Sequence, residues 1–315
     1  MKDEYVVVVG GINIDIGGRS AAPLIPRDSN PGTVCFSMGG VGRNIAHNLV
    51  QLGVPVRFLT VVGDDAYAAM ARRSCEEVGL GLQDARFVPG GRTSVYLFID
   101  GPEGDMELAV CDAALAAAID PEYLAEKLDV LNGAAAVVLD GNLTAEAIAF
   151  LGQHCTAPLF ADPVSVSKGQ KLQPIVSRLH TMKPNRIEAQ AMTGVDTGTP
   201  EGVERAAREL LRRGVRRVFI SLGGNGLFCA AASEAGLNDE MCQLPCLPVQ
   251  LRNATGGGDA MMAALVAAYL DGRSLSEAGR FALAASALTV EYEETINPNL
   301  TRQAAEKRAG LPHKE

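Results

Sequence analysis

The sequence is poor in the residues that build metal centres and disulfide frameworks. Its 315 residues include only four histidines, and none of them has the spacing of zinc ligands. Seven cysteines are scattered along the chain, and no two of them form a Cys-x-x-Cys pair. This odd, unpaired set predicts reduced thiols in a cytoplasmic protein and argues against a zinc site.

Long apolar runs are also missing, and we expect no N-terminal targeting segment. The longest apolar run, residues 260–270, is too short to cross a bilayer. The N-terminus is charged and then becomes strand-like, unlike a signal peptide. A formal net charge of -9 argues against non-specific binding of nucleic acid. We therefore expect a cytoplasmic protein without a membrane or nucleic-acid partner.

The most informative stretch is the string Asn253-Ala-Thr-Gly-Gly-Gly-Asp259, which stands directly before the apolar run 260–270. That run is typical of a buried helix. Glycines at a helix N-terminus leave backbone N–H groups free to bind an anion, above all a phosphate. No Gly-Lys-Ser/Thr follows the glycines, so the string is not a P-loop.

Asp259 falls in the first turn of this helix. Because a helix N-terminus stabilises negative charge, we expect the pKa of Asp259 to be lowered. A weak base fixed beside a phosphate site suits phosphoryl transfer, in which the nucleophile needs orientation more than full deprotonation. The alternative is that Thr255 or Asp259 only caps the helix and that the glycines form a turn.

The rest of the chain alternates between strands and helices. This order is typical of an α/β fold with a mostly parallel central sheet between helices. Strands are expected at 5–9, 56–62, 135–139, 159–162 and 217–221, and helices at about 44–52, 67–78, 121–131, 145–154, 172–179, 200–213 and 275–291. The last dozen residues are polar, and we expect them to be frayed.

Two segments interrupt this alternation. Residues 17–37 contain three prolines, and residues 92–111 have the pattern of a β-hairpin. Together they could form a small separate sheet that closes over a substrate as a lid. The alternative is an extra hairpin at the edge of the main sheet.

Polar residues cluster near the N-terminus, just after the first expected strand. Asn13 and Asp15 alternate with isoleucines and therefore point to one face, an arrangement that suits vicinal hydroxyl groups. The alternative is a solvated strand end. The string Met38-Gly-Gly-Val-Gly-Arg-Asn44 then opens a helix, where glycines allow a ligand to approach the backbone closely.

Two further polar patterns lie in the second half of the chain. Asn185 and Glu188 are three residues apart and share the first turn of an expected helix, where they could also form a capping box. Ser221 and two glycines, Gly223 and Gly226, connect two expected strands.

These motifs, in this order, resemble the signatures of the ribokinase (PfkB-type) carbohydrate kinase family. The resembling strings are Gly39-Gly-x-Gly-x-Asn44, Asn185-x-x-Glu188, Ser221-x-Gly-x-x-Gly226 and Gly256-Gly-Gly-Asp259. The resemblance implies one domain over residues 1–315, with a three-layer α/β/α fold, a central mostly parallel sheet and a small β-lid. It also implies ATP-dependent phosphorylation of a hydroxymethyl group on a sugar or nucleoside.

The same resemblance assigns roles to residues. Asp259 would take the proton of the acceptor hydroxyl, and the backbone N–H groups of Gly256, Gly257 and Gly258 would hold the transferred phosphoryl group. The substrate would be bound by Asn13, Asp15, Gly40, Gly42, Arg43 and Asn44, and by lid residues such as Thr93 that contact the base. ATP would lie against Asn185, Ser221, Gly223, Gly226 and, by its spacing from Asp259, Leu283. Glu188 would organise Mg²⁺ through water.

More specific strings narrow the substrate. Lys183-Pro-Asn-Arg-Ile-Glu188 and Asp259-Ala-Met-Met262 resemble the branch of the family that phosphorylates pseudouridine. Another nucleoside, or a small sugar, is the alternative acceptor, and an inactive binding protein on the same scaffold is a third hypothesis. Asn253 stands where cation-activated relatives have Asp, which argues against activation by a monovalent cation. A homodimer formed through the lid is expected from the family alone.

Overall fold

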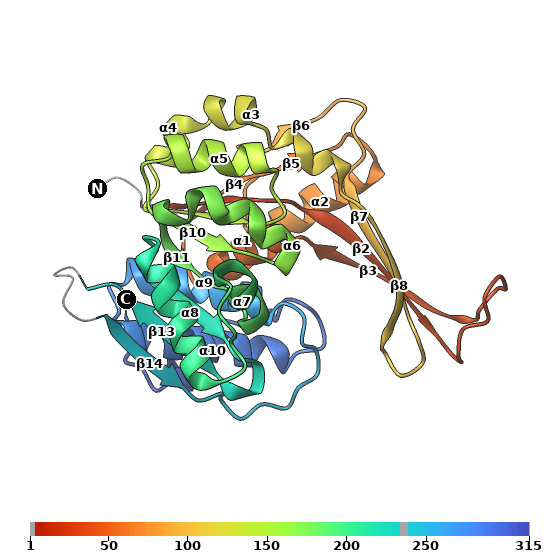
Figure 1. Ribbon diagram of the computed structural model, residues 1–315. Coiled ribbons are helices and arrows are strands. Elements are labelled where there is room, and N and C mark those ends of the chain that lie inside the picture. Colours follow the sequence, from red (N-terminus) through yellow and green to blue (C-terminus); the bar gives the residue numbers. More distant parts are fainter. Residues whose placement is uncertain (1–3, 234–238, 315) are drawn as a thin grey trace.

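The computed structural model describes residues 4–233 and 239–314, and its central element is an eight-stranded sheet (Figure 1). The strand order is β14-β13-β12-β11-β10-β9-β1-β4. Neighbours from β4 to β12 pair in parallel, and β13 and β14 add an antiparallel edge. The strands are β1 Val6–Val9, β4 Val56–Leu59, β9 Ala136–Asp140, β10 Leu159–Asp162, β11 Leu179–Met182, β12 Arg217–Ser221, β13 Leu227–Ala231 and β14 Glu240–Leu244.

Helices cover both faces of this sheet, as the alternation of strands and helices predicted. Val6 and Val8 of β1 pack into one apolar core and Val7 and Val9 into another, because successive side chains of a strand point to opposite faces. The first core includes α1 Val41–Gln51, α2 Ala66–Glu77, α9 Gly257–Leu270, α10 Leu275–Val290 and α11 Arg302–Ala309. The second core includes α3 Pro121–Glu126, α4 Leu128–Asn132, α5 Ala145–His154, α7 Arg186–Thr193 and α8 Pro200–Arg212. The short helix α6 Val166–Gly169 packs against α7. Within residues 4–233 and 239–314, no helix has the length and apolar character needed to span a membrane.

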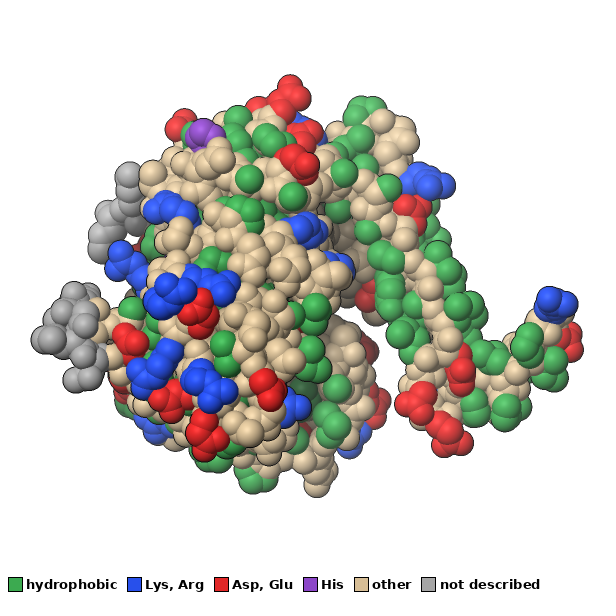
Figure 2. All heavy atoms as spheres, viewed as in Figure 1, with side chains coloured by type: hydrophobic (Ala, Val, Ile, Leu, Met, Phe, Trp, Pro, Cys, Tyr) green, Lys and Arg blue, Asp and Glu red, His purple; other side chains and the backbone are tan. Residues whose placement is uncertain are grey.

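A second, four-stranded sheet projects from the body as an arm (Figures 1 and 2). We call it the small sheet; its order is β3-β2-β7-β8, with β2 Asn13–Ser20, β3 Gly32–Gly39, β7 Ser94–Asp100 and β8 Met106–Asp112. Strand β2 pairs in parallel with β7, so the two segments that interrupt the alternation lie side by side. Because β2 starts at Asn13, the small sheet is rooted next to the end of β1.

Three predicted elements differ from the structure. The strand expected at 56–62 is divided at Thr60, because β5 Val61–Val62 leaves the main sheet and pairs with β6 Arg86–Phe87. The helix expected at 121–131 is divided at Lys127 into α3 and α4. The helix expected at 172–179 is a 3₁₀ helix, η2 Gln170–Arg178, and Pro174 inside it has no N–H to give to an α-helical turn.

The prediction of a frayed C-terminus is wrong. Helix α11 is capped by Thr301, and its Glu306 is buried. The Glu306 carboxylate forms an ion pair with Arg273, whose side chain is fully buried and lies over the ring of Phe281. The polar residues of α11 therefore have a partner inside the protein rather than only in solvent.

Candidate active site

Several charged and glycine residues follow the carboxyl ends of the central parallel strands. Gly10 follows β1, Asp140 and Asp162 end β9 and β10, and Lys183 follows β11. In open α/β sheets, ligands bind in the crevice outside the carboxyl ends of the strands. The strand order therefore gathers these residues at the edge where a ligand is expected.

Two glycine-led helices begin at this edge. The N-cap residues Gly40 of α1 and Gly256 of α9 have φ angles of 100° and 86°, in the region that favours glycine. A Cβ on Gly256 would lie 2.0 Å from the carbonyl oxygen of Thr295, so no larger residue fits. Among the described side chains none caps α9, and the alternative that Thr255 or Asp259 caps it is wrong. The backbone N–H groups of residues 256–259, here called the anion hole, thus remain available to a ligand.

Asp259 and Asn44 connect the two helices across the site. The amide Nδ2 of Asn44 donates to Oδ2 of Asp259 over 2.9 Å, although the residues are 215 positions apart in sequence. Burial, reinforced by the charge of Asp162, raises the pKa of Asp259 to about 7. The expectation of a lowered pKa is therefore wrong, because it considered only the helix dipole and neither the burial of the carboxyl group nor the neighbouring carboxylates.

Lys183 is a site residue that the sequence analysis did not assign. Its Nζ lies 2.9 Å from Oδ2 of Asp162, and both side chains are more than nine-tenths buried. A Cβ on Gly258 would lie 3.5 Å from the same Nζ, which places the ammonium beside the anion hole. The sequence feature that could have identified Lys183 is its position directly after a buried strand, in the string that ends at Glu188.

Asp140 is a second site residue that the sequence analysis did not assign. Its Oδ1 accepts a hydrogen bond from the backbone N–H of Asn142 over 2.6 Å. Its Oδ2 is buried and has no partner among the described residues, and it lies near Gly10. Burial raises the pKa of Asp140 to about 6. An unpartnered buried carboxylate oxygen is costly, so this atom is placed to accept a hydrogen bond from a ligand.

Asn13 and Asp15 lie together at the root of the small sheet, as their alternation with isoleucine predicted. Nδ2 of Asn13 donates to Oδ1 of Asp15. Burial raises the pKa of Asp15 to about 6, against the effects of Asn13 and Arg43. A Cβ on Gly39 would lie 2.2 Å from the Asp15 carboxylate, and one on Gly40 would lie 3.0 Å from Oδ1 of Asn13. The glycines of the Gly-Gly pair therefore make room for these two side chains.

Three other residues expected at the substrate have different surroundings. Gly42 packs against Gly10, since a Cβ at position 42 would lie 2.6 Å from the Cα of Gly10, so it lets α1 approach β1. Thr93 is buried, and its hydroxyl donates to Asp65 over 2.8 Å, so this group supports the start of α2 instead of facing a base. Arg43 is buried beside Ser74 and lines a pocket of about 690 Å³ between α1, α2 and the small sheet.

Asn185 and Glu188 form a capping box, which the sequence analysis gave as the alternative to a role in ligand binding. Oδ1 of Asn185 accepts from the N–H of Glu188, and Oε2 of Glu188 accepts from the N–H of Asn185, at 2.9 and 2.8 Å. Burial raises the pKa of Glu188. No three Asp, Glu, His or Cys side chains in the described part of the chain are close enough to hold a metal ion by themselves. The carboxylate of Glu188 is an oxygen donor of the kind that Mg²⁺ takes together with water and phosphate.

The residues expected at the nucleotide share one pocket of about 430 Å³. Its lining includes Ser221, Gly223, Gly226, Leu283, Gly257 and Gly258. Asn185 adjoins this group, because it forms a β-bridge with Ser221. Gly226 has a φ of 92° and would place a Cβ 2.0 Å from the carbonyl oxygen of Leu244. The pocket is largely apolar at its Leu283 end and meets the anion hole at Gly257 and Gly258.

Asn253 uses its neutral amide in the loop before the anion hole. Nδ2 donates to the carbonyl oxygen of Glu293 over 3.1 Å, and Oδ1 accepts from the N–H of Thr255 over 2.8 Å. An aspartate could not make the first of these bonds, because it has no donor. The amide of Asn253 thus joins its own loop to the loop that contains Glu293. It does so at the position where cation-activated relatives are expected to have a charged aspartate.

Comparison with known proteins gives a consistent assignment. Residues 3–302 match the pfkB family of carbohydrate kinases. The chain is 37% identical to pseudouridine kinase of Escherichia coli K12 over 95% of each chain, and 33% identical to the uncharacterized sugar kinase YeiI of the same strain over 96% of this chain and 83% of that protein. Arabidopsis thaliana ribokinase, solved with ribose and ATP, shares the fold with a TM-score of 0.85 at 23% identity, covering 98% of this chain and 99% of that chain. The chain therefore belongs to the pfkB carbohydrate kinase family, as its motifs predicted.

Proposed function

We propose that this protein is an ATP-dependent kinase that phosphorylates the 5′-hydroxyl of pseudouridine, giving pseudouridine 5′-phosphate and ADP. Members of its family transfer a phosphoryl group to an alcohol, so the open question is the acceptor. The contact between Asn44 and Asp259 carries the proposal, because it joins the substrate-side helix α1 to the anion hole of α9. We infer that the reaction takes place in the cytoplasm, which fits seven cysteines that are all free.

Asp259 acts as the general base in this proposal. Its carboxylate takes the proton of the acceptor hydroxyl as the oxygen attacks the γ-phosphorus of ATP. A base with a pKa of about 7 is well matched to proton transfer near neutral pH. The backbone N–H groups of Gly256, Gly257 and Gly258 stabilise the negative charge that the phosphoryl oxygens carry during transfer.

ATP binds in the pocket lined by Ser221, Gly223, Gly226 and Leu283, with its phosphates toward the anion hole. Asn185, which forms a β-bridge with Ser221, would contact those phosphates. Bound Mg²⁺ would neutralise phosphate charge and would be held by Glu188 through water. In this proposal, the residues around Ser221 and Glu188 orient ATP, and a separate set of residues positions the acceptor.

The acceptor ribose is bound by Asn13 and Asp15. Their paired amide and carboxylate suit the 2′- and 3′-hydroxyls, and the small sheet closes over the nucleoside as a lid. The choice of pseudouridine rests on the 37% identical relative of that name. A different nucleoside or a small sugar is the alternative, which the 33% identical sugar kinase favours.

The acceptor is tested by measuring ADP release with Mg-ATP and a panel of pseudouridine, uridine, adenosine, ribose and fructose. We expect the highest kcat/KM with pseudouridine. Pseudouridine and uridine share the ribose and differ in the base linkage, which leaves an extra N–H on pseudouridine. A site that hydrogen-bonds a polar group rejects an analogue without it by about 10⁴-fold or more, so uridine is expected to be a poor substrate.

The same panel can contradict the proposal in two ways. A higher kcat/KM with adenosine, ribose or fructose than with pseudouridine would contradict the proposed acceptor, but would leave the assigned fold and phosphoryl-transfer chemistry unchanged. Absence of ADP release with every acceptor, together with ATP binding detected by calorimetry, would favour an inactive binding protein.

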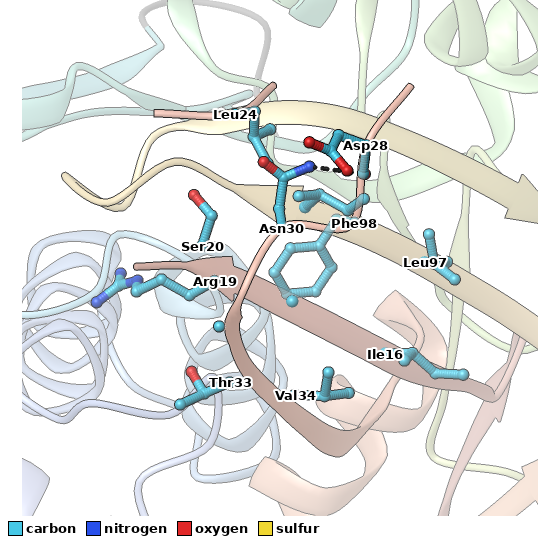
Figure 3. Close-up of a pocket in the computed structure, with 13 residues that line it drawn as sticks. Ile16, Arg19, Ser20, Leu24, Asp28, Asn30, Thr33, Val34, Leu97 and Phe98 are labelled. Atoms are coloured by element: carbon cyan, nitrogen blue, oxygen red, sulfur yellow. Dashed lines mark hydrogen bonds between the residues drawn. The ribbon is translucent and has the colours of Figure 1, made fainter. Parts of the chain in front are cut away.

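We also propose that the small sheet pairs with its copy in a homodimer. On the face opposite Asp15, the registered neighbours Phe36, Ile16, Leu97 and Val110 form an apolar row across the four strands. Phe36 and Val110 are 57% and 61% exposed. Figure 2 shows apolar side chains along this arm. A pocket of about 390 Å³ lies on it, and Figure 3 shows its lining residues, among them Ile16, Val34 and Leu97. An exposed apolar patch of this kind marks an interaction site.

Light scattering in solution tests the dimer. The unmodified protein is expected to have twice the mass of the chain, and Val110→Lys is expected to give monomers, because a buried unpaired ammonium is strongly unfavourable in an interface. Val249→Lys, an exposed valine outside the small sheet, is the control and should remain dimeric. A monomeric unmodified protein, or a dimer unaffected by Val110→Lys, would contradict the assignment of this surface.

A further inference from the structure

Lys183 lies between an acidic partner and the anion hole. Its ammonium is paired with Asp162 at 2.9 Å, and it stands 3.5 Å from where a Cβ of Gly258 would be. The hydrogen bond to Asp162 uses one of the three donors of the ammonium, which leaves others for a ligand at the N–H groups of residues 256–259. The geometry places a full positive charge where the anion hole otherwise offers only backbone dipoles.

The charges around Lys183 explain why a cation is needed at this point. Asp162, Asp259, Glu188 and Asp140 surround the place where the phosphates of ATP would enter. Burial disfavours the charge of Lys183, but Asp162, Asp259 and Glu188 more than offset it and raise the pKa of the lysine above its ordinary value. Lys183 therefore stays protonated in a cluster that would otherwise repel a polyphosphate.

We propose that Lys183 is a catalytic residue whose ammonium contacts the transferred phosphoryl group, and that Asp162 is the positioning residue that aims it into the anion hole. This inference rests on the proposed kinase function and adds two residues to its machinery. It assigns Asp162 no proton transfer, because that carboxylate remains paired with the ammonium throughout.

The step balances without a further reactant. The acceptor oxygen forms a bond to the γ-phosphorus while the bond from that phosphorus to the bridging oxygen of ADP breaks. The hydroxyl proton goes to the carboxylate of Asp259, and the leaving oxygen carries its electron pair away with ADP. Lys183 keeps its proton and neutralises the charge on the non-bridging oxygens as the phosphoryl group passes.

The first test is Lys183→Met in the full-length protein, assayed with Mg-ATP and whichever panel acceptor is best. Removing one charge-stabilising donor from such a site lowers kcat by about 10²- to 10³-fold, and we expect a loss of this size. The Kd of the acceptor, measured without ATP, should remain within about threefold, since Lys183 does not contact the ribose. Lys127→Met is the matched control, because Lys127 also pairs with an aspartate, Asp84, but far from the site, and should keep full activity.

A structural role for Lys183 predicts a different pattern. If the lysine only neutralises buried Asp162, the double variant Lys183→Met/Asp162→Asn should recover most of the activity, because it leaves no unpaired charge. We expect no recovery of kcat in the double variant. Recovery to within about threefold of the unmodified enzyme would overturn the proposal, as would full activity of Lys183→Met.

The pH profile gives an independent readout. Asp259 is surrounded by Asp162, Lys183, Asp140 and Asn44, and its acid limb in kcat/KM is expected near pH 7. Because Lys183 favours the carboxylate and Asp162 opposes it, Lys183→Met should move the limb to higher pH and Asp162→Asn to lower pH. Shifts in the same direction, or none, would contradict the arrangement.

If the unmodified protein phosphorylates no acceptor, the proposed function itself has failed, and this outcome is distinct from an active protein that tolerates Lys183→Met.

Discussion

Asp259→Asn is expected to lower kcat by about 10²- to 10⁴-fold, the range for loss of a positioned general base. Asparagine keeps the size and the hydrogen-bonding geometry of the side chain, so it can still bond to Asn44, but its amide cannot take the acceptor proton. The Kd values of ATP and of the nucleoside should therefore change little. Steady-state kinetics and calorimetric titration of the same preparation separate the two quantities.

The pH dependence sharpens this test. In the unmodified enzyme the base must be deprotonated, so the rate should fall as the pH is lowered through about 7. The residual activity of Asp259→Asn should lack this acid limb. Asp129→Asn is a matched control, because Asp129 also lies in the first turn of a helix but is exposed on α4. Undiminished turnover in Asp259→Asn would refute the assigned chemistry.

Arg273→Met is expected to lower the free energy of unfolding by about 3 to 5 kcal/mol, the cost of breaking a buried ion pair by removing one partner. The substitution leaves the buried carboxylate of Glu306 with only the His313 ring and the backbone N–H of Lys314 as partners. It also removes the bond from the same guanidinium to Asp271 and its contact with the ring of Phe281. Urea-induced unfolding followed by circular dichroism measures the change.

Two further variants isolate the cause of this destabilisation. The double variant Arg273→Met/Glu306→Gln should recover a large part of the loss, because no unpaired charge then remains. Arg73→Met, which breaks an exposed pair with Glu77, should leave the free energy of unfolding nearly unchanged, because exposed ion pairs contribute little. Equal effects of Arg73→Met and Arg273→Met would mean that burial of the pair is not what stabilises α11.

The site could be predicted from the sequence where its parts are local strings. The glycines before α1 and α9, and the Asn185 and Glu188 pair, are each recognisable within a few residues, and parallel strands necessarily bring their carboxyl ends together. The raised pKa of Asp259 could not be predicted in this way. It depends first on burial and then on Asp162, which is 97 positions away in sequence and becomes a neighbour only through the order of the strands.

The same distinction explains the errors in the fold. Helix α11 has few apolar residues, so the spacing of apolar residues in the sequence does not predict that it is stable. Its stability depends on Arg273, which lies 33 positions before Glu306 in the chain. The segment 56–62 is hydrophobic along most of its length, so a single strand was expected. In the structure, the residues before Thr60 pair with β1 and the residues after it pair with β6. Hydrophobic pattern predicts that a segment is extended or helical, whereas its partners are decided by the whole topology.

The bond between Asn44 and Asp259 has a consequence for the protein during its synthesis. The ribosome produces α1 early and α9 late, and a domain folds as a unit. A nascent chain that includes α1 but not α9 lacks both Asp259 and the N–H groups of the anion hole. On the proposed function, we expect any product that terminates before residue 259 to lack phosphoryl-transfer activity and therefore not to consume ATP.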